Sequence, residues 1–391
     1  MATDAANSSQ VTAGLYLHVP FCLSRCIYCD FYSTTAGVGE QQAYADAVAH
    51  ELDIRLGDGP PPTISTLYIG GGTPSILQPE VRRRLFRAVK SRVRLSPQAE
   101  ITIEANPDDV TPEFCTELVG LGVNRVSLGV QTFDDSSLRL LRRRHTAAEA
   151  KRAVCRLAQH GIENISIDLI FGLPGQTLEQ WRDNVSTALG LPIKHLSAYA
   201  LMYEEGTPLT RLRDTGRLTE TDEQTSLDMF EVLLDLTAGR MEHYEISNYA
   251  YPGFRSRHNS AYWRSVPYIG IGPGAHSFDG KATRRANAAE LKAYIVAATA
   301  GTDVPHADEH LTVSEQLDEC IFTALRTSEG LDVSAVGQRF GRQWAKQLLD
   351  AARPHLKAGR LCFDRSMHLC LTRSGLFVSD SVMADLMCCE D

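Results

Sequence analysis

Three cysteines near the start of the chain, Cys22, Cys26 and Cys29, carry the clearest chemical signal in the sequence. Their spacing is C-x3-C-x2-C, and thiolates are the usual protein ligands of iron–sulfur clusters. A cubic four-iron cluster takes four thiolates when every iron has a protein ligand, and no fourth cysteine stands nearby. The spacing therefore predicts a cluster with one iron left open for a small molecule.

Two other roles compete with a cluster. A structural zinc site wants four ligands in a closed tetrahedron, and His18, in an apolar run that reads as a strand, is the available fourth ligand. Disulfides are disfavoured because the ten cysteines are scattered over 391 residues with no secretory signal before them. Cys155 falls on the apolar face of an expected helix and reads as a small core residue, and Cys388 and Cys389 lie in the last few residues.

Polar and glycine-rich motifs follow several expected strands. Gly70-Gly71-Gly72-Thr73-Pro74 lets the backbone approach a ligand closely, although a tight turn is the simpler interpretation of such a run by itself. Beside an open cluster iron, the run becomes a candidate cradle for the ammonium and carboxylate of an amino acid. Complementary charge and hydrogen bonds are expected from Glu104, Gln131, Arg143 and Asp168. Arg143 belongs to a run of three arginines, for which a solvated surface is the simpler interpretation.

The elements that must position these residues read as alternating strands and helices. Strands are predicted over 14–19, 65–69, 100–104, 125–130, 165–171 and 195–201, and helices over 41–56, from Thr111-Pro112, over 147–159 with Gly161 as a cap, and over 222–236. The strands look nearly continuous in apolar residues, which is typical of a parallel sheet covered on both sides. These units imply an α/β fold, either a β/α barrel or an open doubly wound sheet, with its functional loops at the carboxyl ends of the strands.

After a stretch of Pro and Gly at 301–305, the tail has a different pattern. Helices are predicted over 313–326, 333–340 and 343–358, followed by a hairpin of 361–363 with 368–371. This order resembles a winged helix, but the tail carries both charge signs and reads as a packing or partner module. A net charge of −9 also argues against a nucleic-acid-binding surface.

No apolar run is long enough to cross a bilayer. Residues 1–13 read as a flexible leader with neither a secretory nor a mitochondrial pattern. A cytoplasmic location is therefore expected.

These motifs together resemble the radical S-adenosylmethionine superfamily. The residues that carry the resemblance are Tyr16-x-His18-x-Pro20-Phe21-Cys22, the Gly70–Pro74 run, Ser127-x-Gly-x-Gln131, Asp168-Leu-Ile-x-Gly-Leu-Pro174 and Gly270-x-Gly-Pro-Gly-Ala275-His276-Ser277. They are similar to the branch that holds oxygen-independent coproporphyrinogen III dehydrogenase and the HemW haem chaperones.

The resemblance implies a partial (β/α)6 TIM-like barrel over 14–300 and a smaller, mostly helical, winged-helix-like domain over 306–391. It implies a 4Fe-4S cluster on Cys22, Cys26 and Cys29, with S-adenosylmethionine on its open iron. The residues it assigns to S-adenosylmethionine are Tyr16, Gly71, Gly72, Thr73, Glu104, Gln131, Arg143 and Asp168, with Ala200 through its backbone.

Two features separate the members of this branch. The dehydrogenase has a further cysteine two residues after the third and a longer leader, whereas this chain has Phe31 and a short leader. The run His258-Asn259-Ser-Ala-Tyr262-Trp263 matches an H-N-x-x-Y-W pattern that the resemblance associates with haem binding. Imidazole is a common axial ligand of haem iron, so His258 is the candidate ligand. Without the resemblance, a hydrogen-bonded loop histidine beside core aromatics is the simpler interpretation.

The resemblance thus implies a haem chaperone that passes haem to apo-haemoproteins, such as membrane respiratory subunits, without a catalytic residue being assigned. It suggests a homodimer and contact with the membrane only through partners. The negative net charge argues against a nucleic-acid partner. Two alternatives stay open. One is the oxidative decarboxylation of coproporphyrinogen III, and the other is a radical haem-opening methyltransferase.

Overall fold

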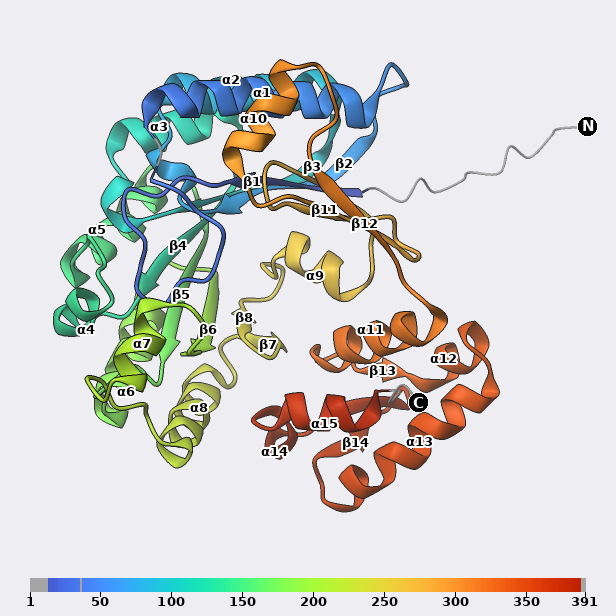
Figure 1. Ribbon diagram of the computed structural model, residues 1–391. Coiled ribbons are helices and arrows are strands. Elements are labelled where there is room, and N and C mark those ends of the chain that lie inside the picture. The colour runs from blue at the N-terminus through green and yellow to red at the C-terminus, as the bar shows by residue number, and fades with distance from the viewer. Residues whose placement is uncertain (1–12, 36, 388–391) are drawn as a thin grey trace, which may run out of the picture.

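The computed structural model describes residues 13–35 and 37–387, so Cys388 and Cys389 lie outside the described residues. Its centre is a curved sheet of six parallel strands that follow one another in sequence order, with helices on the outer face (Figure 1). This arrangement confirms the expected partial β/α barrel. The six strands are β1 (Ala13–Val19), β2 (Thr63–Gly71), β3 (Arg94–Ala105), β4 (Arg125–Gln131), β5 (Asn164–Phe171) and β6 (His195–Ala200).

The helices between these strands start at recognisable caps. Thr111 accepts a hydrogen bond from the backbone N–H of Phe114 at the start of α3, and Thr146 and Glu149 form a reciprocal capping box on α5. Gly161 follows α5 in the left-handed conformation, as its expected capping role requires. The helices of this region are α1 (Val38–Leu56), α2 (Pro79–Arg92), α3 (Pro112–Leu121), α4 (Asp135–Leu140), α5 (Ala147–Gln159), α6 (Leu178–Leu189), α7 (Pro208–Asp214) and α8 (Glu223–Thr237), with short 3-10 turns at Pro74–Ile76 and Pro107–Asp109.

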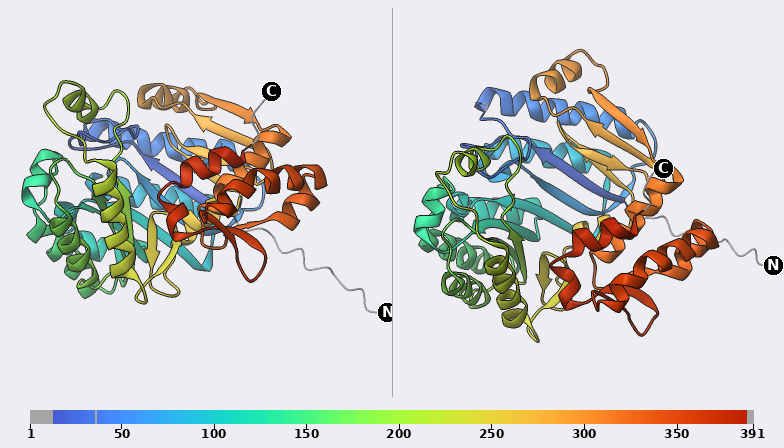
Figure 2. Two further views of the ribbon diagram at one scale, coloured as in Figure 1. Left: turned by 90° about the horizontal axis from the view of Figure 1, so that it is seen from below. Right: turned by 60° about the horizontal axis from the view of Figure 1, so that its bottom comes forward.

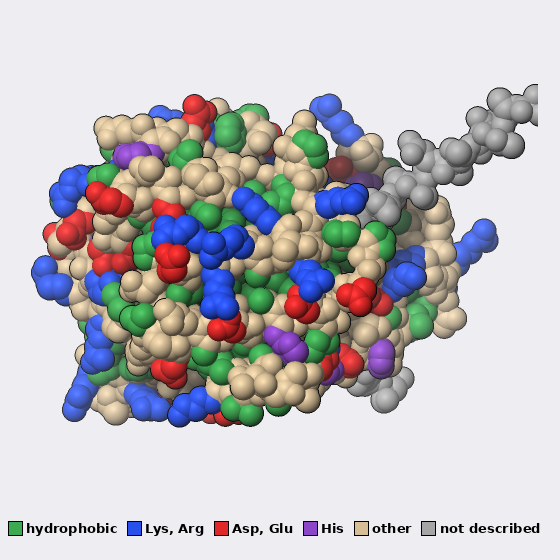
Figure 3. Space-filling view, turned by 90° about the horizontal axis from the view of Figure 1, so that it is seen from above, with side chains coloured by type: hydrophobic (Ala, Val, Ile, Leu, Met, Phe, Trp, Pro, Cys, Tyr) green, Lys and Arg blue, Asp and Glu red, His purple; other side chains and the backbone are tan. Residues whose placement is uncertain are grey.

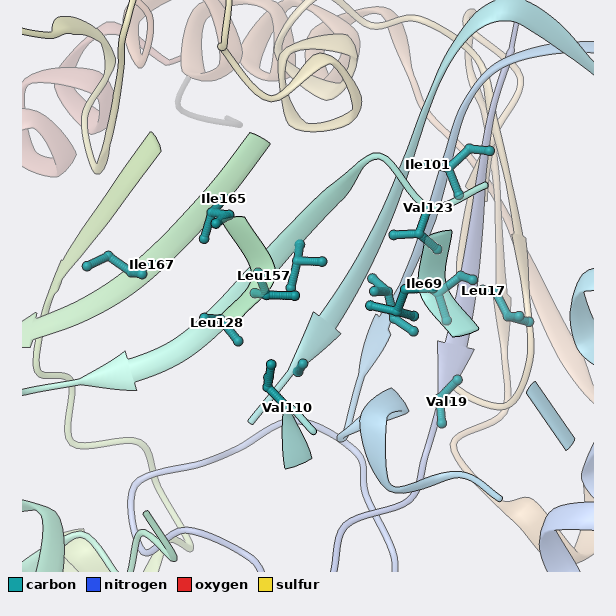
Figure 4. Close-up of a cluster of buried hydrophobic side chains, with 14 of the residues drawn as sticks. Leu17, Val19, Ile69, Ile101, Val110, Val123, Leu128, Leu157, Ile165 and Ile167 are labelled. Carbon is teal, nitrogen blue, oxygen red and sulfur yellow. The ribbon is translucent and has the colours of Figure 1, made fainter. Parts of the chain in front are cut away.

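The strands alternate in character, which corrects the expectation of continuous apolar runs. Leu15, Leu17 and Val19 of β1 are buried in the core under the helices, whereas Tyr16 and His18 point to the opposite face. Figure 4 shows the outer layer, including Leu128 of β4. The inner face is polar because it lines the barrel interior, which we call the lumen, rather than a second layer of helices.

Further strands extend the sheet beyond both edges of the barrel, and the sequence patterns did not reveal them. The strands β8 (Asn248–Ala250) and β7 (Glu242–Glu245) follow β6, while β9 (Tyr268–Ile271), β10 (His276–Phe278), β11 (Thr283–Asn287) and β12 (His306–His310) follow β1. Buried Glu51 of α1 joins the second extension to the barrel. Its carboxylate accepts hydrogen bonds from the Gly272 N–H (2.8 Å), the Asn287 amide (2.7 Å) and the Tyr294 hydroxyl (2.6 Å) of α10 (Leu291–Thr299).

The helix α9 (Arg257–Trp263) closes the lumen at the amino-terminal side of the strands. The backbone N–H groups of Arg257 and His258 donate to the carboxylate of Glu100 on β3 at 3.0 and 3.1 Å. The H-N-x-x-Y-W motif therefore lies at the base of the barrel, away from the cysteine loop.

The C-terminal region has the helix and strand order of a winged helix, with its own core around Leu317, Ile321 and Leu348. It contains α11 (Val313–Leu325), β13 (Leu331–Asp332), α12 (Val333–Arg339), α13 (Arg342–Lys357), β14 (Leu361–Phe363), β15 (His368–Leu371), α14 (Arg373–Leu376) and α15 (Ser379–Leu386). The expected hairpin is part of a three-stranded sheet in the order β13-β15-β14. The strand β12, inside the range expected for this domain, pairs with the barrel sheet instead. Figure 2 shows the domain against one side of the barrel.

The surface mixes charges of both signs. Figure 3 shows basic and acidic side chains next to one another on the face where α1 and α2 lie, and Arg84 of α2 pairs there with Asp46 of α1. None of the helices within the described residues is long and apolar enough to span a membrane. Cys155 is exposed rather than in the core, because it lies one position beyond the apolar stripe of α5 that Val154 and Leu157 occupy.

Candidate cluster and cofactor site

The cysteine loop follows β1 at the carboxyl end of the barrel. Cys22, Cys26 and Cys29 are free and half-buried, and the Cys22 thiol lies 3.3 Å from the Thr73 hydroxyl after β2. Burial, together with the neighbouring Cys26 and Cys22 sulfurs, raises the pKa of the Cys29 thiol to about 11. A positively charged cluster core would lower this pKa, because it binds the thiolate form.

The alternative of a zinc site has no support in this geometry. Within residues 13–35 and 37–387, no three His, Cys, Asp or Glu side chains form a group that could hold a single metal ion. The His18 ring lies instead between the Tyr16 hydroxyl and the Tyr32 carbonyl, each 3.1 Å away. In a cubane each thiolate binds a different iron, so the three sulfurs do not need to converge on one ion.

The glycine run after β2 makes a cradle that only glycine fits. Gly71 has φ of +107°, and a Cβ there would lie 2.5 Å from the His18 ring. A Cβ on Gly72 would lie 2.6 Å from the Phe21 carbonyl oxygen. The backbone N–H of Gly72 donates to the Val19 carbonyl at 2.8 Å. The cradle and the cysteine loop are therefore held together as one surface.

Two carboxylates line the lumen below this cradle. Glu104 accepts hydrogen bonds from the Tyr68 hydroxyl (2.7 Å) and the Gly71 N–H (3.0 Å), and Ser127 donates to Asp168 at 3.3 Å. Burial raises the pKa of Glu104 to about 7, against the lowering effect of the Tyr68 hydrogen bond. Burial likewise raises the pKa of Asp168 to about 6. Two carboxylates with such raised pKa values gain from a cation, which suits a ligand that carries ammonium and sulfonium groups.

Arg143 differs from its two neighbours in the arginine run. Its guanidinium donates to the Cys26 sulfur at 3.2 Å, to the Asn106 side-chain oxygen at 2.7 Å and to the Gly129 carbonyl at 2.6 Å. Arg144, by contrast, pairs with the acidic residues of the loop after β3. Arg143 therefore supplies positive charge directly beside the Cys26 sulfur, where it would offset the negative charge of a thiolate ligand.

Gln131 ends β4 in a strained backbone conformation. Its φ of +67° lies in the left-handed region that residues with a side chain rarely adopt, and the register of β4 against β5 shifts at this point. Such strain is concentrated at ligand-binding positions, where it aims a side chain in an unusual direction.

The structure brings most of the candidate residues together at one end of the barrel. Tyr16, the three cysteines, Gly71, Gly72, Thr73, Glu104, Gln131, Arg143, Asp168 and Ala200 all lie on the lumen face or at the carboxyl ends of β1–β6. Their individual contacts with a cofactor stay predictions.

His258 is the exception. It is buried at the base, with Nδ1 2.8 Å from the Thr66 hydroxyl and Nε2 2.8 Å from the Tyr262 hydroxyl. Burial lowers the pKa of the imidazole to about 3, so the ring is neutral. A direct bond from His258 to haem iron stays a prediction, and it requires one of these two hydrogen bonds to break first.

Two positioning contacts escaped the sequence patterns. Tyr68 holds Glu104, and Asn106 holds Arg143. Tyr68 could have been found because it lies two residues before Gly70 in a strand, and side chains two apart share a face. Nothing in the sequence marks Arg143 as the partner of Asn106, because the two residues are 37 positions apart.

Comparison with known proteins identifies the family. Residues 16–188 match the radical SAM superfamily, and residues 311–378 match the HemN C-terminal domain. The heme chaperone HemW of Bacillus subtilis (strain 168) is 36% identical over 330 residues, covering 84% of this chain and 86% of that protein. HemW of Escherichia coli (strain K12) is 38% identical over 264 residues, covering 67% and 69%. The chain belongs to the HemW family of radical SAM proteins.

A solved structure agrees with the fold. Coproporphyrinogen III oxidase (HemN) from Escherichia coli, described as a radical SAM enzyme, superposes with a TM-score of 0.82 at 23% identity, covering 96% of this chain and 90% of that chain. At this identity the likeness shows the fold alone. Membership of the superfamily implies a 4Fe-4S cluster and S-adenosylmethionine. The three-cysteine loop, the glycine cradle and the acidic lumen fit both groups.

Proposed function

We propose that this HemW family member is a haem chaperone that holds a 4Fe-4S cluster and S-adenosylmethionine, binds haem and passes it to apo-haemoproteins. The observation that carries the proposal is the match to proteins named heme chaperone HemW over most of both chains. Bound S-adenosylmethionine supplies a source of the deoxyadenosyl radical when the cluster donates an electron. The proposal requires this chain to bind and release haem, not to turn it over.

The cysteine loop supports this reading over a decarboxylase. Phe31 stands where the dehydrogenase that the sequence resembles has a further cysteine, and 64% of its surface is exposed. An exposed phenyl ring at the mouth of the barrel offers apolar contact but neither a sulfur ligand nor a proton.

The experiment compares the two activities on one preparation. Full-length protein is reconstituted anaerobically with iron and sulfide, and ferric haem is titrated into it while absorbance is recorded. We expect a cluster absorption band, about one haem per chain, and transfer of that haem to an apo-haemoprotein added later. No haem binding by protein that carries its cluster would refute the proposal.

The rival activity is tested in the same way. Reduced protein is incubated with coproporphyrinogen III and S-adenosylmethionine, and the products are separated. We expect no protoporphyrinogen. Its formation would show that the chain is a decarboxylase, and formation of an opened tetrapyrrole from haem would point instead to a haem-opening methyltransferase.

The partners and the location follow from the same proposal. Apo-haemoproteins, membrane respiratory subunits among them, are the proposed acceptors, the proposed location is the cytoplasm with peripheral contact to the membrane through these partners, and the proposed assembly is a homodimer. Sedimentation with and without haem tests the assembly, because a dimer doubles the mass of a 43.1 kDa chain.

A further inference from the structure

A half-open cavity of about 450 Å³ lies between the barrel and the C-terminal domain. Its volume is in the range of about 300–1,000 Å³ that is usual for small-molecule sites. It is bounded by residues of β9–β11, of α11 and of the end of α9. The helices α9 and α11 contact each other and lie side by side in Figure 1. Five aromatic side chains and the polar residues Arg284, Glu319 and Thr323 are among the residues that line it.

Flat aromatic side chains from four elements form its walls. Tyr262 and Trp263 come from α9, Tyr268 from β9, Phe278 from β10 and Phe322 from α11. The Tyr262 and Tyr268 rings meet edge to face with centroids 4.6 Å apart. Such walls offer large apolar surface to a planar macrocycle, and the open side leaves room for charged substituents in water.

The polar groups of the cavity differ in whether they are already engaged. The Tyr262 hydroxyl is bonded to His258, the Thr323 hydroxyl donates to the Glu319 carbonyl at 2.7 Å, and the Glu319 carboxylate pairs with Arg284. The structure shows no hydrogen bond from the Tyr268 hydroxyl to any of the described residues. Burial raises the pKa of this phenol, and the positive charge of Arg284 opposes that rise. Tyr268 is therefore an uncommitted phenol beside a cation.

We propose that haem binds in this cavity with the Tyr268 oxygen as an axial ligand of the ferric iron. The inference rests on the proposed haem-binding function and assigns its site. Tyrosinate is an established protein ligand of haem iron. Ferric haem in water carries hydroxide on its iron, so the exchange forms the iron–oxygen bond to Tyr268, breaks the bond to hydroxide and releases water. The phenol proton leaves in that water, and the iron stays ferric.

In this arrangement His258 is a positioning residue. It lies behind Tyr262, on the lumen side, and its hydrogen bond fixes the ring that forms one wall of the cavity. The cavity also requires the C-terminal domain, since α11 supplies Phe322 and Thr323. The haem site and the cluster site then lie on opposite sides of α9.

The test titrates ferric haem into the reconstituted full-length protein and records the absorption spectrum and dissociation constant. In Tyr268→Phe we expect loss of the tyrosinate charge-transfer band and an affinity about tenfold weaker. Tyr251→Phe, outside the cavity, is the matched control and should behave like the unmutated protein. Thr323→Trp, which fills the cavity from α11, should lower the amount of haem bound while the cluster band is retained.

The outcomes separate the site from the function. An unchanged spectrum in Tyr268→Phe, or a spectrum that changes only in His258→Ala, would overturn Tyr268 as the ligand. Full haem binding in Thr323→Trp would overturn the cavity itself. In each of these cases the chaperone proposal survives, because it rests on haem binding and transfer by the unmutated protein.

Discussion

Replacing Tyr68 by Phe should move the pH dependence of S-adenosylmethionine binding without disturbing the barrel. The hydroxyl of Tyr68 donates to Glu104, while the ring stacks on His258 with centroids 5.1 Å apart. Phe keeps the ring and removes only the hydrogen bond. Because that bond stabilises the carboxylate, the pKa of Glu104 should rise above its present value of about 7.

The size of the effect follows from the hydrogen bond. A hydrogen bond to a charged group contributes about 1.5–3 kcal/mol, so a rise of about one pKa unit is a conservative expectation. At pH 7 the ionised fraction of Glu104 then falls from about one half to about one tenth. If the carboxylate binds the ammonium group, affinity falls about fivefold at pH 7 but less than about twofold at pH 8.

The assay is calorimetric titration of S-adenosylmethionine into protein with a reconstituted cluster, between pH 6 and 8. The ratio of unmutated to Tyr68→Phe affinity is compared across pH, because this ratio cancels the titration of the ligand itself. We expect it to fall steadily as pH rises. Glu104→Gln supplies the control. When both proteins of the comparison carry Glu104→Gln, no carboxylate titrates at this position, and the affinity ratio with and without Tyr68→Phe should not depend on pH. A ratio that stays constant across pH, or tighter binding by Tyr68→Phe at pH 7, would contradict the reasoning.

Four further outcomes are expected. Glu104→Gln should raise the melting temperature of the cofactor-free protein by a few degrees at pH 8 and change it little at pH 4. The pKa of Glu104 is about 7 in the folded protein, raised from its usual value of 4.5. The carboxyl group therefore contributes stability that is fully present below about pH 4.5 and is lost as the pH rises through about 7. Arg143→Met should make the cluster harder to reduce in an EPR-monitored potential titration, whereas Arg144→Met should leave its potential unchanged, because only Arg143 touches a cluster cysteine. Glu51→Leu should lower the free energy of unfolding by about 3–5 kcal/mol in urea, because it leaves several buried donors unpaired; an effect below 1 kcal/mol would contradict the role of that network. Gly71→Ala should weaken S-adenosylmethionine binding and also lower the melting temperature, because the added Cβ would clash with the His18 ring. Full affinity for S-adenosylmethionine in that variant would show that the cradle is not the site.

The barrel was predictable because its units are local. Thr146 with Glu149 and Gly161 mark both ends of α5 in the sequence, and the predicted limits of that helix are those observed. The motifs at the carboxyl ends of β1 to β5 were expected to lie close together, because parallel strands place their carboxyl ends at one edge of a sheet. That is why Cys22 and Glu104 could be placed at one site without a structure.

What the sequence could not show depends on contacts across the fold. The strands β9 to β12 are only three to five residues long, too short to show a clear pattern. Glu51, on a helix more than 200 residues earlier, joins Gly272, Asn287 and Tyr294 to the barrel. The inner face of the strands was misread for a similar reason. Tyr16 counts as apolar in a pattern, yet its hydroxyl contacts His18 inside a polar lumen.

The base of the lumen explains why the affinity of a His258 variant cannot identify an iron ligand. A polar interior needs its buried groups paired, and α9 does this by donating backbone N–H groups to Glu100 while His258 pairs with Thr66 and Tyr262. Substituting His258 by Ala therefore disturbs Tyr262, one wall of the cavity, whichever residue binds iron. Both assignments expect weaker haem binding in that variant. They differ only in the spectrum of the haem that still binds, which keeps its tyrosinate band if Tyr268 is the ligand and changes if His258 is.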